Sequence, residues 1–370
     1  MDPAWLTPAW LSVALALLPA GIGLHNLLRQ PRAGGSVPAG KLVSILVPAR
    51  DEAAHIETCL QAALAQQGVA IEVLVMDDGS VDDTAAIVQR MASADARLRL
   101  LAAPPLPPGY TGKVAACAAL AEAARGTHLL FVDADVRLAP GAAAAMLGHA
   151  ASHDIALVSG VPRQSIGSLG EALTVPGINL LLLGYLPGGG RAVTRQAGLA
   201  AACGQLLLVE AAAYRQVGGH RALAGVMHDA LALARRFRAA GLRTEVVDGA
   251  PLADCRMYRT LREAWAGFAK NATEGMATPL GLPVWSVLLA GAHLWPWALL
   301  PQAPAVLALL LVLALRAAIT WRAREPWWTV PLHPLAVATA LAIQWYALAR
   351  ALMGRPAGWK GRAYAATKAA

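Results

Sequence analysis

The chain has 370 residues, of which 57% are hydrophobic and only 15% are charged. This composition is too apolar for an ordinary soluble enzyme. The net charge of +8 favours attraction to anionic lipid headgroups and to diphosphate groups, whereas nucleic-acid binding is disfavoured because basic residues are not interleaved with stacking aromatic ones. The four cysteines are scattered without metal-binding spacing, so we expect them to be reduced and none to be catalytic.

An apolar stretch opens the chain. Residues 4–28 are almost uncharged and long enough to cross a bilayer. A cleaved signal peptide is the alternative, but no basic segment precedes the stretch, and Arg29, Arg32 and Lys41 follow it. Because a basic flank stays on the cytoplasmic side, we expect residues 1–30 to anchor the chain, with the next part in the cytoplasm.

Strands and helices then alternate at short intervals. The predicted strands are residues 42–48, 71–76, 98–101 and 129–132, and the predicted helices are residues 53–66, a stretch from about residue 83, and residues 111–125. This alternation predicts an α/β fold, with a mostly parallel sheet and helices on both faces. Pro48 is expected to end the first strand, because proline cannot continue a central ladder.

Charged residues directly follow three of these strands: Arg50 and Glu52, Asp77 and Asp78, and Asp133 and Asp135. Right-handed crossovers place the three strand ends at one edge of the sheet, where open α/β sheets bind ligands. Asp133 and Asp135 point the same way, and two hard oxygen donors suit Mg²⁺ or Mn²⁺ on substrate phosphates. The alternative is that Asp135 caps a helix that Pro140 begins.

Several motifs occur in a fixed order along the chain: residues 43–52, 73–84, 131–135, 203–209 and 218–220, Asp229, and residues 256–258 and 267–271. This series resembles family 2 glycosyltransferases with the nucleotide-diphosphosugar transferase (GT-A-like) fold. The resemblance covers about residues 40–275. Together with Trp359-Lys-Gly-Arg362, it is similar to the membrane-bound branch that glycosylates carotenoids and related terpenoid lipids.

The resemblance implies a donor pocket for a UDP-sugar. Asp78 matches the position that contacts the uracil and ribose, and Pro48, Arg50 and Glu52 would line the same pocket. Asp135 matches the principal ligand of a Mn²⁺ or Mg²⁺ cofactor, and Asp133 would face the nucleotide or the water shell of the metal. The metal would neutralise the diphosphate as it leaves.

Lys113 lies in Gly109-Tyr-Thr-Gly-Lys113, which resembles a phosphate loop but lacks a glycine of the full Walker motif. We interpret Lys113 as a lysine at a helix start that steadies the donor diphosphate. A plain surface lysine is the alternative.

Asp229 matches the general base of the family, which would take the proton of the acceptor hydroxyl during an inverting displacement. Because Asp229 also begins a helix, a role as a dipole-complementing cap is the alternative. His228 stands where the family usually has an acidic residue, and it either tunes the pKa of Asp229 or has no role. Arg256, Tyr258 and His228 are expected on the acceptor or diphosphate side. The Gln-x-x-Arg-Trp motif of processive synthases is absent at residues 256–258.

The C-terminal part is mostly apolar. Residues 256–278 are amphipathic and are expected to lie on the membrane, and residues 280–300, 302–320 and 330–352 are candidate spans bordered by tryptophans. Arg322 and Arg324 favour a cytoplasmic position for the loop between the second and third candidate spans. The basic tail at 353–370 favours the cytoplasm as well, and three full spans do not place both on that side. We therefore expect residues 280–300 to be re-entrant or interfacial. A soluble apolar bundle is the alternative.

These expectations divide the chain into an anchor (1–30), a catalytic domain (40–255), an interfacial segment (256–278), two to three transmembrane or re-entrant helices (280–352) and a basic tail (353–370). The expected function is transfer of a sugar from a UDP-sugar to a hydroxyl or carboxyl of a terpenoid or carotenoid lipid. The expected location is the cell inner membrane, with a cytoplasmic catalytic domain. The alternatives are transfer to a polyprenyl phosphate, which needs no base, and a non-catalytic membrane scaffold.

Overall fold

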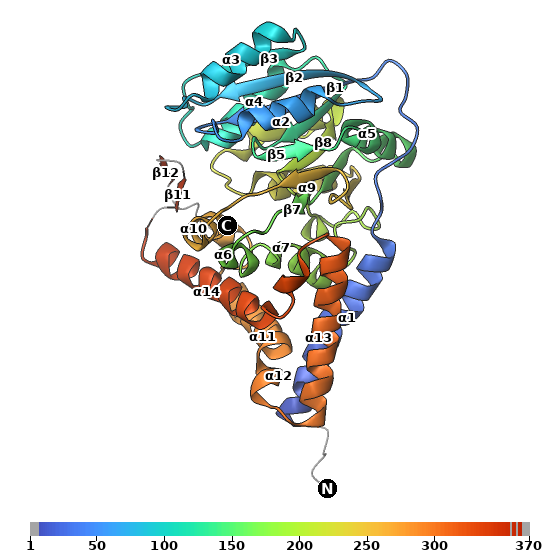
Figure 1. Ribbon diagram of the computed structural model, residues 1–370, viewed down its shortest axis with the longest axis vertical. Helices are drawn as coiled ribbons and strands as arrows, with labels where there is room; N and C mark the ends of the chain where they lie inside the picture. The colour runs from blue at the N-terminus through green and yellow to red at the C-terminus, as the bar shows by residue number, and fades with distance from the viewer. Residues whose placement is uncertain (1–6, 356, 360–361, 365–370) are drawn as a thin grey trace. The chain divides into compact units, whose positions relative to one another are not determined.

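The computed structural model describes residues 7–355, 357–359 and 362–364 and consists of two compact units (Figure 1). The α/β unit comprises residues 30–164 and 190–256, and the helical unit comprises the described parts of residues 1–29, 165–189 and 257–370. Residues 165–189, which lie inside the stretch expected to form the catalytic domain, therefore belong with the helical unit.

A seven-stranded sheet organises the α/β unit. Its strand order is β3-β2-β1-β4-β8-β6-β9. The strands are β1 (Leu42–Ala49), β2 (Ala70–Asp77), β3 (Leu98–Ala102), β4 (His128–Val132), β6 (Leu157–Gly160), β8 (Leu206–Glu210) and β9 (Thr244–Val247). Only β8 is antiparallel to its neighbours β4 and β6, while all other neighbouring strands of this sheet are parallel. The mostly parallel sheet expected from the sequence is confirmed.

Helices alternate with these strands, as the sequence predicts. They are α2 (Ile56–Leu64), α3 (Thr84–Ala94), α4 (Gly112–Ala123), α5 (Ala142–His153), α8 (Ala211–Gln216) and α9 (Asp229–Ala239). Figure 1 shows α2, α4, α5 and α9 around the sheet. The predicted helix at 111–125 starts one residue later, because Thr111 is its N-cap and accepts a hydrogen bond from the Val114 N–H (3.4 Å).

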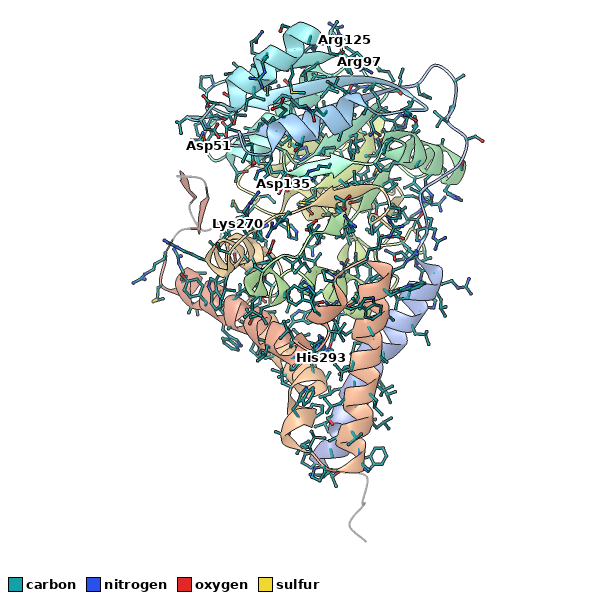
Figure 2. The ribbon with its side chains drawn as sticks, in the orientation of Figure 1. Asp51, Arg97, Arg125, Asp135, Lys270 and His293 are labelled. Atoms are coloured by element: carbon teal, nitrogen blue, oxygen red, sulfur yellow. The ribbon has the colours of Figure 1, made fainter. Side chains whose placement is uncertain are left out.

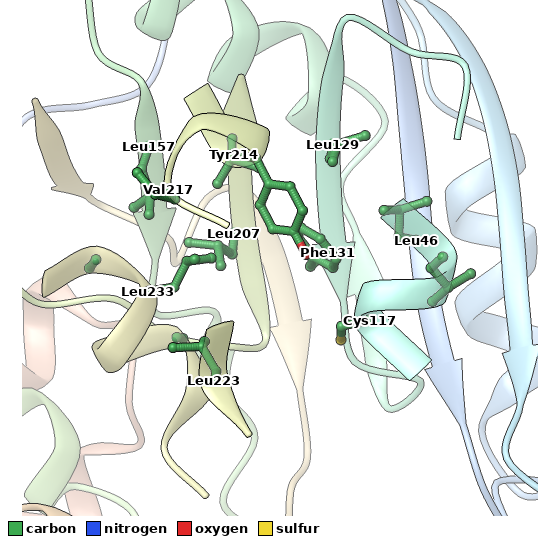
Figure 3. Packing of buried hydrophobic residues seen from close by; sticks show 14 of the residues in the cluster. Leu46, Cys117, Leu129, Phe131, Leu157, Leu207, Tyr214, Val217, Leu223 and Leu233 are labelled. Atoms are coloured by element: carbon green, nitrogen blue, oxygen red, sulfur yellow. The ribbon is translucent and has the colours of Figure 1, made fainter. Parts of the chain in front are cut away.

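An apolar cluster packs against one face of this sheet (Figure 3). Alternate strand residues contribute to it, among them Leu129 and Phe131 of β4 and Leu207 of β8, together with residues of α4, α8 and α9. Leu130 and Leu208 lie between these residues in sequence and are also buried, at 0–1% exposure. Both faces of the central strands are therefore covered, which explains why the strands are continuous apolar runs.

Strand β1 runs through Pro48 to Ala49, so the expectation that Pro48 ends it is wrong by one residue. Pro48 lies opposite Met76 of β2, whereas the pairing of β1 with β4 stops at Leu46. Pro48 thus occupies a part of β1 that has a single neighbour. Its missing N–H leaves no ladder hydrogen bond unmade in the centre of the sheet.

A second, three-stranded sheet follows the acidic pair. It consists of β5 (Val136–Leu138), β10 (Ala253–Cys255) and β7 (Arg163–Gln164), in the order β5-β10-β7. Strand β5 begins directly after Asp135, and α5 does not start until Ala142. The interpretation of Asp135 as a helix cap is therefore wrong, because a whole strand separates it from the next helix.

The helical unit contains three helices that are long and apolar enough to cross a membrane: α1 (Pro8–Arg29), α13 (Ala303–Arg322) and α14 (His333–Leu352). Figure 1 shows α1 and α13 side by side. Helix α11 (Gly281–His293) has 13 residues and is too short for a bilayer core of about 30 Å, at about 1.5 Å per residue. A re-entrant or interfacial position of residues 280–300 stays a prediction.

Shorter elements complete this unit: α6 (Leu169–Ala172), α7 (Gly177–Asn179), α10 (Leu261–Asn271), α12 (Trp295–Ala298), and the strand pair β11 (Ala357–Trp359) and β12 (Arg362–Tyr364). Two lysines of the predicted basic tail, Lys360 and Lys368, lie outside the described residues.

A buried ion pair connects α13 to residues 165–189, the segment from the middle of the chain that belongs to the helical unit. Arg316 of α13 is 1% exposed, and its Nη1 lies 2.6 Å from Oε2 of Glu325. Glu325 Oε1 accepts a hydrogen bond from Asn179 Nδ2 (2.9 Å), and Arg316 Nη2 donates to Thr329 Oγ1 (2.8 Å). Because each charged group has hydrogen-bonding partners, residues 165–189 are held specifically to this unit.

Candidate active site

The carboxyl ends of β1, β2 and β4 meet at one edge of the sheet, because these strands are adjacent and parallel. Arg50, Asp78 and Asp133 follow these ends. Strand β8 runs in the opposite direction, so the residues that precede it, Cys203 to Gln205, arrive at the same edge. The edge therefore collects residues from four segments that are distant in sequence.

The predicted donor residues lie on two loops that are hydrogen-bonded to each other. The Asp78 N–H donates to the Ala49 carbonyl (2.9 Å), and Arg50 Nη1 donates to the Asp78 carbonyl and lies 4.0 Å from Asp78 Oδ2. The Glu52 N–H donates to Thr84 Oγ1 at the start of α3 (2.8 Å). The structure thus brings Arg50, Glu52 and Asp78 together beside Pro48, which lies near the end of β1.

Asp135 (Figure 2) has the carboxylates of Asp133 and Glu52 as neighbours. The Oδ1 atom of Asp135 is buried and has no hydrogen-bond partner among the described residues. Burial, together with the neighbouring carboxylates of Asp133 and Glu52, raises the pKa of Asp135 to about 7. The unpartnered oxygen of Asp135, together with the carboxylates of Asp133 and Glu52, fits a divalent cation such as Mn²⁺ or Mg²⁺. The sequence predicted Glu52 at this edge of the sheet, but as a residue of the donor pocket and not as a neighbour of the metal ligands.

Lys113 connects the acidic pair to Asp229. Its Nζ lies 2.6 Å from Asp133 Oδ1. Desolvation lowers the pKa of Lys113, but Asp133 and Asp229 outweigh it and hold the pKa well above its usual value. A Cβ on Gly204 would lie 3.2 Å from Lys113 Nζ and 3.6 Å from Asp229 Oδ1, so Gly204 leaves room for both groups. The side chain of Lys113 remains 39% exposed, which leaves it accessible to a ligand.

Asp229 lies at the first position of α9 and is 7% exposed. Burial raises its pKa, but Lys113 and His220 together outweigh burial and hold the pKa well below the usual range. The Ala230 N–H also hydrogen-bonds to Asp229, as a helix cap would require. Capping accounts for only part of the geometry, since Lys113 and His220 approach from other elements.

His220 is a functional candidate that sequence reasoning missed. Its Nε2 lies 3.6 Å from Asp229 Oδ2. The Tyr214 hydroxyl lies 2.8 Å from Nδ1 and accepts the His220 backbone N–H (2.9 Å). We infer that the Tyr214 hydroxyl donates a hydrogen bond to Nδ1 of His220. The ring hydrogen of His220 is then on Nε2, which faces Asp229. The only sequence signal was the position of His220 in the Gly218-Gly-His220 motif.

The loops and strands of this site fall within a recognised family of enzymes. Residues 44–212 match the model of the family described as glycosyl transferase family 2. The chain contains a family 2 glycosyltransferase domain. The matched residues include the donor-side loops, the acidic pair and Lys113, whereas Asp229 and His220 follow the matched range.

The chain is 25% identical over 292 residues to 4,4'-diaponeurosporenoate glycosyltransferase of Staphylococcus aureus, a match that covers 73% of this chain and 72% of that protein. It is 42% identical over 105 residues to an uncharacterized protein of Mycobacterium tuberculosis, which covers 28% of this chain and 31% of that protein. That match therefore spans less than a third of the relative.

A solved structure supports the fold. The mannosyltransferase of Pyrobaculum calidifontis, in complex with GDP-Man and Mn²⁺, matches with a TM-score of 0.56 at 20% identity. The match covers 94% of this chain and 99% of that one. The GT-A-like fold predicted from the sequence is confirmed.

The cysteines of the α/β unit are closer to the site than their spacing indicated. All four are free, as expected. The thiol of Cys255 hydrogen-bonds to Asp135, and Cys59 Sγ lies 3.8 Å from the Asp133 carbonyl oxygen. Potential ligand atoms of Cys117, His220 and Asp229 lie within 4.8 Å of one another. Only the fold reveals these positions, because no spacing rule links these cysteines to the acidic residues.

The residues expected on the acceptor side are less clearly placed. His228 is the N-cap residue of α9, next to Asp229. Arg256 is the last residue of the α/β unit, and Tyr258 belongs to the helical unit. The ring of Tyr258 packs edge-on against Phe268 of α10, with centroids 5.5 Å apart. Roles for Arg256 and Tyr258 near the acceptor stay predictions.

Proposed function

We propose that this chain is an inverting, metal-dependent hexosyltransferase that moves a sugar from a UDP-sugar to a membrane lipid. The observation that carries the proposal is the arrangement of Asp133, Asp135 and Asp229 around Lys113 at one edge of the sheet. It supplies an acidic metal pair and a separate carboxylate base. The family 2 domain supports the reaction class.

On the donor side, Pro48, Arg50, Glu52 and Asp78 would hold the nucleotide, and Asp135 with Asp133 would hold Mn²⁺ or Mg²⁺. The bound ion would supply Lewis-acid stabilisation of the departing diphosphate. Lys113 would move from Asp133 to the diphosphate, since its charged side chain is accessible and its present partner would be engaged by the ion. The Mn²⁺ and nucleotide sugar of the Pyrobaculum neighbour agree with this arrangement.

On the acceptor side, Asp229 would accept the proton of a hydroxyl while the oxygen attacks the anomeric carbon. Lys113 keeps Asp229 ionised, but it also makes Asp229 a weak base. Movement of Lys113 to the diphosphate would remove this effect and raise the basicity of Asp229 when the donor is bound. His220 would keep the carboxylate oriented during this change.

The acceptor is proposed to be a terpenoid or carotenoid lipid, with a hydroxyl or carboxyl group as the nucleophile. The Staphylococcus relative supports this class, because its name gives a carotenoid carboxylate as substrate. The proposed location is the inner membrane, with the α/β unit in the cytoplasm. The three apolar helices support a multi-pass protein. The proposed anchor is residues 1–30, and the amphipathic segment 256–278 would lie on the membrane surface.

One observation favours an acceptor that is already ionised, which is either a lipid carboxylate or a phosphate. Lys113 and His220 hold the pKa of Asp229 low, against the effect of burial, so Asp229 is a weak base. A polyprenyl phosphate is such an acceptor and needs no general base. A non-catalytic scaffold is disfavoured, since the acidic residues and Lys113 are arranged as a connected site.

The proposal is tested with Asp135→Ala in membranes supplied with labelled UDP-sugar, with mass spectrometry of the extracted lipids. We expect transfer to be abolished while the protein remains folded in the membrane. Excess chelator should have the same effect on the wild type, and Mn²⁺ or Mg²⁺ should restore transfer. Asp95→Ala is the matched control, because Asp95 pairs with Arg97 on the surface just after α3. Full transfer in excess chelator would contradict the metal assignment.

A further inference from the structure

A chain of buried polar side chains ends at Asp135, and the proposed function does not use it. Cys255 is the last residue of β10 and lies opposite Val136 of β5, the residue that follows Asp135. The pairing of these strands brings the thiol of Cys255 to Asp135, to which it hydrogen-bonds. Cys255 is 2% exposed, so its sulfur faces the acidic pair and is shielded from solvent.

Burial and the carboxylates of Asp135 and Asp133 raise the pKa of the Cys255 thiol, so the sulfur is protonated in the absence of a cation. One amide group is directed at this sulfur. Gln205 Nε2 donates a hydrogen bond to Cys255 Sγ at 2.9 Å. Gln164 Nε2 donates to Gln205 Oε1, also at 2.9 Å, which fixes the orientation of the Gln205 amide. With its oxygen occupied by Gln164, the amide presents its N–H₂ group to the sulfur. An N–H directed at a sulfur stabilises a thiolate more than a neutral thiol.

The position beside this sulfur is suited to a cation. Asp135 Oδ1 is buried and lacks a hydrogen-bond partner among the residues that the structure describes. An oxygen and a sulfur donor therefore adjoin each other, and Asp133 and Glu52 add negative charge. The hydrogen bond from the Cys255 thiol to Asp135 leaves the Oδ1 atom of Asp135 without a partner among the described residues.

We propose that Cys255 is a thiolate ligand of the divalent metal, alongside Asp135, and that the ion is one with affinity for sulfur. Binding replaces the thiol proton, which is released to solvent, and a metal–sulfur bond forms. This inference rests on the metal of the proposed function and specifies its class. Mg²⁺ prefers oxygen ligands, whereas affinity for mixed oxygen and sulfur sites rises from Mn²⁺ through Co²⁺. The site should therefore prefer Mn²⁺ and Co²⁺ to Mg²⁺.

The test uses the full chain, purified in detergent, freed of metal and titrated with Co²⁺. We expect the intense near-ultraviolet absorption of a thiolate–cobalt bond in the wild type and its loss in Cys255→Ser. Cys203→Ser is the matched control, because this thiol lies 3.6 Å from Gln205 Oε1 and is not paired with Asp135. The control should retain the band.

A second measurement compares the dissociation constants of Mn²⁺ and Mg²⁺ by competition. Cys255→Ser should weaken Mn²⁺ binding at least about tenfold and reduce the preference for Mn²⁺ over Mg²⁺. If Cys255→Ser does not fold, Gln205→Leu replaces it. That variant should keep the cobalt band and bind Mn²⁺ more weakly, because it removes the N–H from the sulfur.

Cobalt binding without the thiolate band, a band that survives in Cys255→Ser, or no bound cobalt would each overturn the inference. These measurements test the metal-ligand role of Cys255 separately from the proposed function, because they do not measure sugar transfer. A thiolate band in a protein that lacks transferase activity would leave the ligand assignment standing. Metal-dependent transfer without the band would instead support the function and overturn the role of Cys255.

Discussion

Asp229 shows how neighbouring side chains set the chemistry of one residue. Burial alone would raise its pKa and favour the protonated acid. Lys113 and His220 reverse this effect, so the carboxylate stays ionised. Whether this carboxylate acts as a base depends on the acceptor, because a hydroxyl needs a base, whereas a carboxylate or a phosphate does not.

Substitution of Asp229 by asparagine distinguishes these acceptors. Asn keeps the shape and hydrogen-bonding capacity of the side chain but does not accept a proton. With a hydroxyl acceptor we expect turnover to fall about 10²–10⁴-fold, while donor affinity is nearly unchanged, because the proposed nucleotide contacts lie at Asp78 and Asp135. Initial rates and UDP-sugar binding measure the two effects separately.

His228→Ala is the control for the neighbouring position and should cost much less. His220→Ala should lower turnover less than Asp229→Asn, since it removes a group that orients the carboxylate but leaves the carboxylate itself. An unchanged rate in Asp229→Asn would assign Asp229 to the helix cap and favour an acceptor that is already ionised. A loss of donor affinity with normal turnover would instead place Asp229 in the donor site.

At the scale of elements, β4 is central because it joins the parallel strands to the antiparallel β8. Its last residue leads into the acidic pair, and its first residue, His128, lies half-buried at the opposite end of the strand. Burial, and to a smaller extent the charge of Lys41, lowers the pKa of His128 to about 4. The folded protein therefore holds a neutral imidazole at this strand start.

This shift makes stability depend on pH. The unfolded chain binds a proton at His128 near pH 6.5, whereas the folded chain binds it only near pH 4. The free energy of unfolding is therefore unaffected by His128 above about pH 6.5 and decreases as the pH falls from there towards 4. We expect the thermal midpoint of the α/β unit to fall over this range, and the fall to be smaller in His128→Gln. Identical pH profiles for the two proteins would contradict the prediction.

Helix α13 depends on the buried pair of Arg316 and Glu325. Glu325→Ala leaves a buried guanidinium without its carboxylate partner and is expected to cost about 3–5 kcal/mol of unfolding free energy. The double variant Arg316→Met/Glu325→Leu removes both charges and should cost less than the single one. Denaturant unfolding in detergent compares them, and a single variant no less stable than the double one would show that the pair does not hold the helix.

At the scale of the whole molecule, the charges that flank α1 predict its orientation in the membrane. The α/β unit follows α1, whose cytoplasmic end is predicted from Arg29 and Arg32. Protease added to sealed, right-side-out cells should therefore leave residues 40–164 intact, and lysed cells provide the control for cleavage. Cleavage within this range from outside would overturn the predicted orientation.

The sequence by itself determined four parallel strands of the sheet and their acidic edge, but not β6, β8 or β9. Apolar runs at β1, β2 and β4 identified the strands, and the rule that parallel strands end at one edge brought Arg50, Asp78 and Asp133 together. These inferences succeeded because strand pattern and strand direction are local properties of the chain. The ends of elements were less certain, as β1 shows by running through Pro48.

Only the tertiary structure decided which side chains surround that edge. Cys255 reaches Asp135 through the pairing of β5 with β10, and His220 reaches Asp229 from a separate turn. Residues 165–189 belong to the helical unit, where Asn179 donates a hydrogen bond to Glu325. The contact of Asn179 with Glu325 joins residues that are 146 positions apart, and no periodicity in the sequence records such contacts. They arise when packing brings these segments together and buried polar groups require partners.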